Sequence, residues 1–350
     1  MLRKIKILKK MARSYLGYKL GHPKPFICVY YTTFRCNLSC PYCPIVTLPP
    51  VNEDYQEVKR TRKSGLELST EKAKYLIDQI AKLGVSLFVF SGGEPLLRKD
   101  LEELAAYVQK KDMLTVLYTN GTLITEERAK LIGKCFDTIA VSLPEVKEQN
   151  NKIREKEDLK KIKEGLRFLK KYSTAKVGVN FVMNKFNYQE IEEVLNFAKE
   201  NCDFISYLAV HYAPDFLLDK EIAKRVGKQL LELKRKHKDF ISDTKEYLSL
   251  FSGHLGGESI SFKCNAFDLY VSIGPNGEFC GCCYPFSIGN ILEQEAVELL
   301  KAGKSRKAEL RKRCGCGILA GCGQLSVLFE QPLLKSIFQG FSFLKKTLFK

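Results

Sequence analysis

Features that would assign the chain to a membrane or secreted class are missing from its 350 residues. No apolar run approaches the roughly 18 residues that a membrane-spanning helix needs. The first residues lack the apolar core and small-residue cleavage site of a secretory signal peptide. Histidine is scarce, and the four histidines are scattered, so we interpret each as a structural or surface group. We therefore expect a folded cytoplasmic protein.

Cysteine, in contrast, is abundant, with 13 in the chain. Cys28, Cys135 and Cys202 stand apart, and the others fall into three tight groups. A disulfide scaffold is the alternative, but such scaffolds are short, secreted and bridged throughout. In a chain without an export signal, tight groups favour metal ligation. The groups are Cys36, Cys40 and Cys43; Cys264, Cys280, Cys282 and Cys283; and Cys314, Cys316 and Cys322.

The formal net charge is +17, from 57 basic and 40 acidic residues, which favours an anionic partner. Residues 1–25 contain eight Lys or Arg and no acidic residue, and residues 331–350 are apolar and basic. Both ends are typical of a basic amphipathic helix on the inner face of an anionic membrane. The alternative is that each end packs on the folded body or forms a loose tail. We expect no nucleic-acid partner, because no known binding module is present.

Strand-like and helix-like segments alternate from residue 26 to about 212. Ser69 and Thr125 stand at capping positions before two of the helices. Such alternation predicts an α/β fold with a parallel sheet, and six units are too few for a closed eight-unit barrel. We therefore predict an open, partial (β/α)6 barrel. The predicted strands are 27–33, 85–90, 114–118, 138–143, 177–183 and 204–210, and the predicted helices include 70–83, 99–111, 125–134, 155–171 and 188–200.

The character of the chain changes near residue 258, where we place a domain boundary. Residues 259–323 are rich in Gly and Cys, and 269–280 is typical of a β-hairpin with an Asn-Gly turn. The predicted segments are a basic amphipathic N-terminus (1–25), the barrel (26–215), a helical connector (216–258), a small Cys-rich domain (259–325) and a basic amphipathic tail (326–350).

The first chemical motif is Cys36-Asn37-Leu38-Ser39-Cys40-Pro41-Tyr42-Cys43, directly after the first predicted strand. Three thiolates on one short loop can hold three irons of a cubane and leave the fourth iron open. A zinc site is the alternative. Zinc sites usually close with four ligands in two C-x₂-C pairs, and no fourth ligand follows here.

Polar residues follow the next strands in turn. Gly92, Gly93, Glu94 and Pro95 come after the second strand, where paired glycines let the backbone approach a ligand and the Glu can meet an ammonium group. Thr119 and Asn120 end the third strand, and Ser142 ends the fourth. Parallel α/β sheets bind their ligands at these carboxyl ends.

In this combination, the chain resembles the radical S-adenosylmethionine (SAM) superfamily over roughly residues 26–212. The resemblance implies that Cys36, Cys40 and Cys43 hold a 4Fe-4S cluster, with Tyr42 as the aromatic residue of that signature. It also implies that the GGEP residues bind the methionine amino group of SAM. Thr119, Asn120 and Ser142 would contact its ribose and carboxylate, and Asn180 and Val182 would lie near its adenine. The sequence departs from many relatives at Ser142-Leu143-Pro144, so loop 144–155 is expected to shape an unusual substrate entrance.

The C-terminal part resembles the SPASM/twitch extension of that superfamily, which holds auxiliary iron–sulfur clusters. The match is partial, because Cys314 and Cys316 form a C-x-C pair and no cysteine follows Cys322. We expect one auxiliary 4Fe-4S cluster, with a zinc ribbon as the alternative. The expected ligands are Cys264 and Cys280, then Cys316 and Cys322, then Cys314, Cys282 and Cys283.

The resemblance implies an enzyme that reductively cleaves SAM to a 5′-deoxyadenosyl radical, which abstracts hydrogen from a substrate carbon. Ferredoxin or flavodoxin is the expected electron donor. Three interpretations stay open: an enzyme acting on a lipid or other hydrophobic substrate at the membrane, a peptide-modifying maturase, or a non-catalytic metal-binding protein. The intact GGEP and cysteine motifs argue against the last. Tyr207, His211 and Tyr284 are candidates to face the substrate.

Overall fold

The computed structural model describes residues 2–43, 45, 65–147, 156–210, 213–258, 263–281, 287–313 and 329. Contacts within the chain divide it into two compact units. The first comprises Met1–Asn37, Pro49–Tyr118 and Cys264–Cys316. The second comprises Leu38–Leu48, Thr119–Lys263 and Gly317–Lys350.

The first unit is built on strands in the order β3-β2-β1-β7-β8-β9. Strands β3, β2, β1 and β7 run parallel, whereas β8 and β9 are antiparallel to their neighbours. The parallel strands are nearly continuous apolar runs because both faces of β1 and β2 are buried. The bounds are β1 Ile27–Thr33, β2 Leu87–Gly92, β3 Leu114–Thr119, β7 Tyr270–Ile273, β8 Glu278–Cys280 and β9 Ser287–Asn290.

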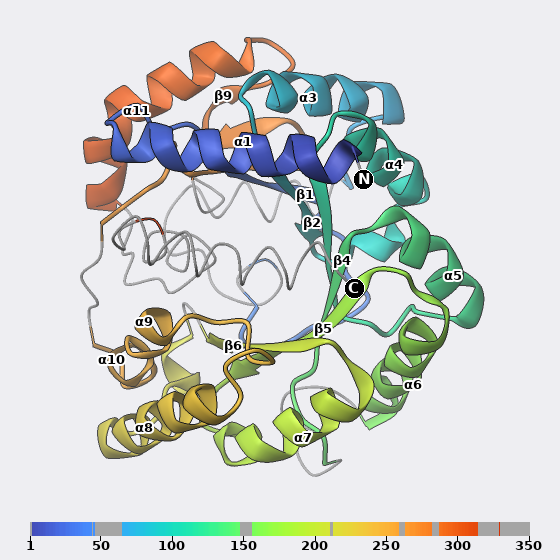
Figure 1. Cartoon of the computed structure of the whole chain (residues 1–350), viewed down its shortest axis with the longest axis vertical. Coiled ribbons are helices and arrows are strands. Elements are labelled where there is room, and N and C mark those ends of the chain that lie inside the picture. The colour runs from blue at the N-terminus through green and yellow to red at the C-terminus, as the bar shows by residue number, and fades with distance from the viewer. Residues whose placement is uncertain are drawn as a thin grey trace. The chain divides into compact units, whose positions relative to one another are not determined.

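Helices flank these strands (Figure 1). They are α1 (Leu2–Lys19), α3 (Thr70–Lys82), α4 (Leu101–Lys110) and α11 (Ala296–Arg313), with the short helix η1 (Pro95–Leu97) after β2. The predicted cap of α3 is confirmed, because the Ser69 side chain accepts the Lys72 N–H. Glu295, just before α11, accepts hydrogen bonds from Gln79 and Lys82 of α3, so these two helices pack together.

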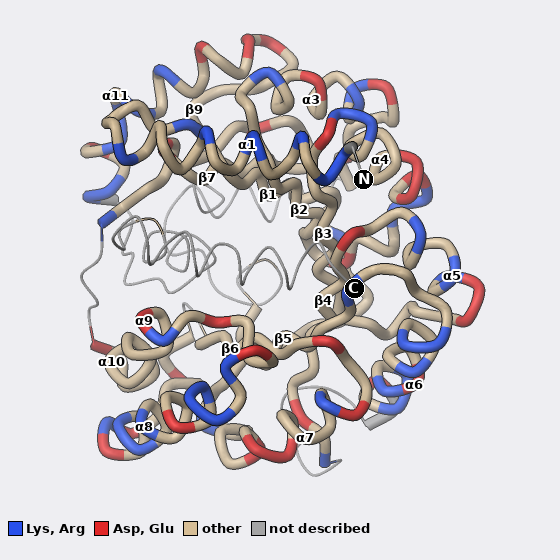
Figure 2. The backbone as a smooth tube through the Cα atoms, viewed as in Figure 1, with Lys and Arg blue, Asp and Glu red and all other residues tan. Residues whose placement is uncertain are grey.

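Helix α1 packs on the folded body along one face. Ile7 and Met11 are buried, and Arg3 and Lys10 donate to the backbone carbonyls of residues 111–113. These contacts favour the packing alternative for the N-terminal segment. Figure 2 shows that the blue residues of α1 have no red ones among them, in contrast to the mixed charges of α6 and α8. Peripheral membrane contact stays a prediction.

The second unit has the parallel strands β4 (Thr138–Ser142), β5 (Lys176–Met183) and β6 (Phe204–Ala209) in that order. Helices α6 and α7 cover β5 and β6 (Figure 1). The predicted cap of α5 is confirmed, because the Thr125 side chain accepts the Arg128 N–H. The helices are α5 (Glu126–Cys135), α6 (Lys156–Tyr172), α7 (Ile191–Asn201), α8 (Lys220–Lys236), α9 (Lys245–Leu248) and α10 (Phe251–Leu255), with η2 (Tyr188–Glu190) and η3 (Pro214–Phe216).

The predicted α/β class and all six predicted parallel strands are confirmed, with strand ends within two residues of those expected. The hairpin is confirmed as well, since β7 and β8 pair in antiparallel fashion around Asn276-Gly277. The sequence did not predict that β7 also pairs in parallel with β1. This pairing places residues 264–313 in the first unit, while the five predicted domain bounds stay predictions. Within the described helices, none is both long and apolar enough to cross a membrane.

Candidate functional site

The three-cysteine loop follows β1, which ends at Thr33. Cys36, Cys40 and Cys43 are all half-buried, and the Cys43 N–H donates to the Cys40 carbonyl at 3.1 Å. Among the described residues, no three His, Cys, Asp or Glu side chains form a ready-made metal site. The fit of a cluster therefore rests on donor chemistry: three partly accessible thiols on one short loop are suitable ligands for three irons of a cubane.

The GGEP turn is bound to the backbone just before Cys36. The Gly93 N–H donates to the Thr33 carbonyl and the Glu94 N–H to the Arg35 carbonyl, both at 2.8 Å. A Cβ on Gly93 would lie 2.2 Å from the Arg35 oxygen, and Gly92 has a φ of 140°. Only glycine fits this close approach. The structure therefore joins the GGEP motif to the residues that lead into the cysteine loop.

Glu94 has a structural role within this turn. Its side chain is fully buried, and Oε1 accepts the Leu96 N–H at 3.0 Å, which caps helix η1. Pro95 is the first residue of η1, where proline is favoured. The predicted contact of Glu94 with the SAM ammonium stays a prediction, and this cap holds the carboxylate in a fixed orientation.

Of the predicted SAM-contacting residues, Thr119 and Ser142 end β3 and β4, whereas Asn180 and Val182 lie within the carboxyl-terminal half of β5. Ser142 and Asn180 are direct neighbours in the register of β4 and β5, so the structure brings these two together. Val182 follows on β5. Thr119 and Asn120 are nearly buried, and their side chains accept the backbone N–H groups of residues 121 and 122. These hydrogen bonds form a rigid turn at the carboxyl end of β3.

Sequence reasoning missed an aromatic contact of Tyr42. Its ring packs edge-on against Phe216 of η3, with centroids 5.6 Å apart, and Phe216 packs in turn against Phe186. The Lys185 N–H donates to the Phe216 carbonyl, which ties η3 to the segment after β5. The contact joins residues far apart in the chain, so no local pattern could have indicated it.

Buried polar side chains hold the start of the loop after β4. Asn187 Nδ2 donates to the Pro144 carbonyl at 2.8 Å, and Glu190 Oε2 accepts the Val146 N–H at 2.7 Å. Both side chains are at least nine-tenths buried. Residues 144–147 are therefore fixed against the β5–α7 connection. Whether loop 144–155 shapes a substrate entrance stays a prediction, because residues 148–155 lie outside the described part.

The auxiliary site is described only in part. Cys280 is buried at the end of β8, and Cys264 is half-buried in the same unit. His211 and Tyr284 also lie outside the described residues. The prediction for Tyr207 is wrong, because its ring is fully buried and its hydroxyl donates to the Ile191 carbonyl. Five further expected cluster ligands lie outside the described residues: Cys282, Cys283, Cys314, Cys316 and Cys322.

Sequence comparison gives the family signal for residues 30–198, which match the Radical SAM superfamily. The chain is 38% identical over 179 residues to Fe-coproporphyrin III synthase of Methanosarcina barkeri, covering 51% of this chain and 41% of that protein. It is 27% identical over 331 residues to AdoMet-dependent heme synthase of the same organism, covering 85% and 91%. It is also 38% identical over 119 residues to PqqA peptide cyclase of Granulibacter bethesdensis, covering 34% and 29%. The chain thus spans less than half the length of the first and third of these relatives.

Comparison with solved structures finds proteins with a similar fold. The crystal structure of Streptococcus suis SuiB bound to S-adenosylmethionine matches with a TM-score of 0.63 at 17% identity, covering 90% of this chain and 75% of that one. At this identity, the likeness concerns the fold alone.

Proposed function

Because residues 30–198 match the Radical SAM superfamily, we propose that the chain is an enzyme that cleaves SAM reductively and abstracts hydrogen from a substrate carbon. When bound, a 4Fe-4S cluster supplies the electron that splits SAM into methionine and a 5′-deoxyadenosyl radical. The proposal is carried by one observation: the GGEP turn is hydrogen-bonded to Thr33 and Arg35, immediately before the first cysteine of the loop.

The chain's own residues would bind and orient the reactants. Cys36, Cys40 and Cys43 would hold the cluster, and the backbone of the GGEP turn would bind the methionine end of SAM. Thr119, Asn120 and Ser142 would contact the ribose and carboxylate of SAM, and Asn180 and Val182 would lie near its adenine. Tyr42, supported by Phe216, would cover the bound cofactor and exclude water. An acidic redox protein such as ferredoxin or flavodoxin would deliver electrons.

The test is anaerobic reconstitution with iron and sulfide, followed by dithionite and SAM. We expect 5′-deoxyadenosine, and about eight irons per chain if one auxiliary 4Fe-4S cluster is present beside the first. Cys36→Ala should abolish product formation. Cys202→Ala is the matched control, because Cys202 lies apart from the loop and burial raises its pKa to about 12. Zinc in place of iron, with no SAM cleavage, would contradict the proposal and favour a metal-binding protein.

For the substrate, we propose an iron tetrapyrrole. The alignment with the heme synthase spans 85% of this chain and 91% of that protein. A tetrapyrrole combines an apolar ring with anionic carboxylates, which suits a chain of net charge +17. It also belongs to the hydrophobic class expected from the sequence.

A peptide substrate is the second candidate, supported by the similarity to a peptide cyclase. The two are separated by measuring 5′-deoxyadenosine in the presence of Fe-coproporphyrin III or of a peptide encoded beside the gene. Stimulation by the tetrapyrrole alone supports the first candidate. Stimulation by the peptide alone, with a mass change in that peptide, would overturn it in favour of a maturase.

A further inference from the structure

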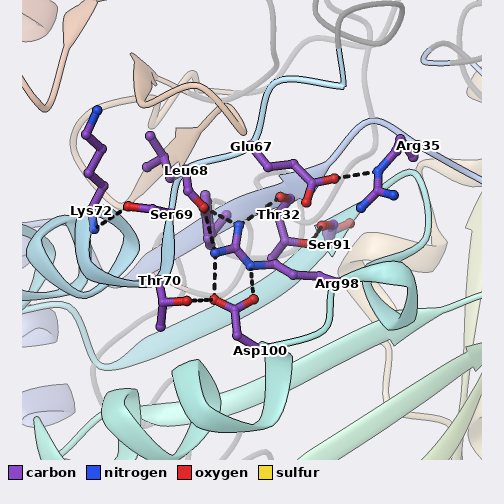
Figure 3. Close-up of polar contacts among 11 residues, drawn as sticks. Thr32, Arg35, Glu67, Leu68, Ser69, Thr70, Lys72, Ser91, Arg98 and Asp100 are labelled. Carbon is purple, nitrogen blue, oxygen red and sulfur yellow. Dashed lines mark hydrogen bonds and ion pairs between the residues drawn. The ribbon is translucent and has the colours of Figure 1, made fainter.

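Arg98 is a buried charge to which the proposed chemistry assigns no role. It follows the GGEP turn by three residues and is only 3% exposed. Its Nε and Nη2 donate to the two carboxylate oxygens of Asp100 at 2.7 and 2.9 Å. Nη2 also donates to the Leu68 carbonyl at 2.8 Å, and Nη1 lies 3.4 Å from the Thr32 carbonyl oxygen (Figure 3).

These bonds join three segments at the carboxyl end of β1 and β2. Thr32 belongs to β1, Leu68 precedes α3, and Arg98 closes η1 with its own N–H on the Pro95 carbonyl. The Thr32 hydroxyl donates to the Ser91 carbonyl, so β1 is also fastened to the residue before Gly92. One guanidinium therefore holds the turn against the strand that leads to Cys36.

The charge of the pair is maintained by its surroundings. Burial opposes ionisation of Asp100, but hydrogen bonds from Arg98 and the Thr70 hydroxyl outweigh burial and lower the pKa of the carboxyl. A planar guanidinium can satisfy a carboxylate with two parallel bonds and still reach two carbonyls. A lysine ammonium carries the same charge but cannot reproduce that fork.

A second ion pair continues the connection on the cysteine side. Arg35 Nε contacts Glu67 Oε1 at 2.7 Å, next to Leu68, and the Arg35 carbonyl accepts the Glu94 N–H (Figure 3). The Leu68 N–H donates to the Pro275 carbonyl at 2.9 Å, in the turn of the β7–β8 hairpin that ends at Cys280. The Leu68 carbonyl therefore binds Arg98, while the Leu68 amide binds the hairpin, so this residue connects the two.

We propose that Arg98 is a positioning residue for SAM: it holds the GGEP turn and the approach to Cys36 in the arrangement that binds the methionine end of SAM. This proposal rests on the proposed function for its ligand. The positioning itself concerns contacts within the apoprotein and can be tested without the cluster.

The experiment compares wild type with Arg98→Lys in two measurements. In the apoprotein, hydrogen–deuterium exchange at the Gly93 and Glu94 amides should be at least about tenfold faster in R98K, while amides of β1 bonded to β7 keep their protection. In the reconstituted protein, equilibrium dialysis should show a SAM Kd at least about tenfold higher, equivalent to 1.4 kcal/mol, at unchanged iron content.

Arg306→Lys is the matched control, since Arg306 is an exposed arginine paired with Glu309 on α11. Unchanged exchange and Kd in R98K would overturn the proposal, as would equal loss of protection throughout β1. If wild type fails to bind SAM, the proposed function fails, yet the exchange measurement still decides whether Arg98 holds the turn. If R98K does not fold, Asp100→Asn replaces it. We then expect smaller increases in the exchange rates of the two amides and in the SAM Kd, and wild-type values of both would overturn the proposal.

Discussion

At the scale of single residues, burial separates the cysteines by reactivity. Cys28 is fully buried on β1, and burial raises its pKa far above the ordinary value of a thiol. Cys202 is partly accessible at the surface, but burial of most of its surroundings still raises its pKa to about 12. Such thiols are inert because the thiolate, not the thiol, ligates metals. Cys36, Cys40 and Cys43 are partly accessible, which agrees with their proposed role.

Asp243 is the residue for which the structure gives a pH dependence. It is 1% exposed and accepts hydrogen bonds from the Ser206 hydroxyl and the Tyr207 N–H. Burial raises its pKa to about 6, from an ordinary value of 3.8, although the hydrogen bonds from Tyr207 and Ser206 and the charge of Lys234 oppose the shift. The folded state therefore binds a proton more tightly than the unfolded state, and the contribution of Asp243 to stability increases as pH falls through 6 towards 4.

We predict that this contribution amounts to about 1.4 kcal/mol between pH 7 and pH 5 and disappears in Asp243→Asn. Urea unfolding of the apoproteins at pH 7 and pH 5 gives the free energy of unfolding of wild type and variant. The difference between the two proteins should be larger at pH 5 than at pH 7 by this amount. Asp215→Asn, at an exposed position of η3, is the control and should follow wild type. A difference between wild type and D243N that does not change with pH would show that Asp243 is not the titrating group.

At the scale of elements, the sequence predicted those features that depend on neighbours in the chain. The β-branched and aromatic run at 27–33 became β1, and the caps at Ser69 and Thr125 formed as expected. The contact of Tyr42 with Phe216 and the bonds of Arg98 were not predicted. They depend on which elements meet in space, and one arginine or phenylalanine among many carries no local signal of that kind.

Helix α1 gives a test of its packed face. Ile7 is fully buried, whereas Leu16 on the same helix is 49% exposed. We predict that Ile7→Ala lowers the free energy of unfolding by about 2–4 kcal/mol, because it leaves a cavity against the body. Leu16→Ala should change it by less than about 0.5 kcal/mol. Urea unfolding measures both, and an equal, small effect of the two variants would mean that the helix does not pack as described.

At the scale of the whole molecule, pairing of β1 with β7 makes β7, β8 and β9 part of the same sheet as the first strands. Ile27 to Tyr30 of β1 are in register with Tyr270 to Ile273 of β7. The change of composition near residue 258 predicts a domain boundary there, and that boundary stays a prediction. Composition, however, does not indicate which strand edge a later segment covers.

We predict that a chain shortened to residues 1–258 aggregates as apoprotein, because the backbone groups of β1 that face β7 lose their partners. A chain ending at Arg313 retains β7, β8, β9 and α11 and should elute as a monomer. Size-exclusion chromatography with light scattering measures both. If the 1–258 chain were equally monomeric and soluble, the pairing would contribute little to the first unit.

The same pairing has a consequence for biosynthesis. β1 leaves the ribosome before its partner β7, which is made about 240 residues later. At roughly 5–20 residues per second, the edge of β1 waits on the order of 10 to 50 seconds for its neighbour. During that interval, the nascent chain presents an apolar strand with open hydrogen-bonding groups. Production in a cell should therefore respond to translation speed and to chaperones that shield strand edges.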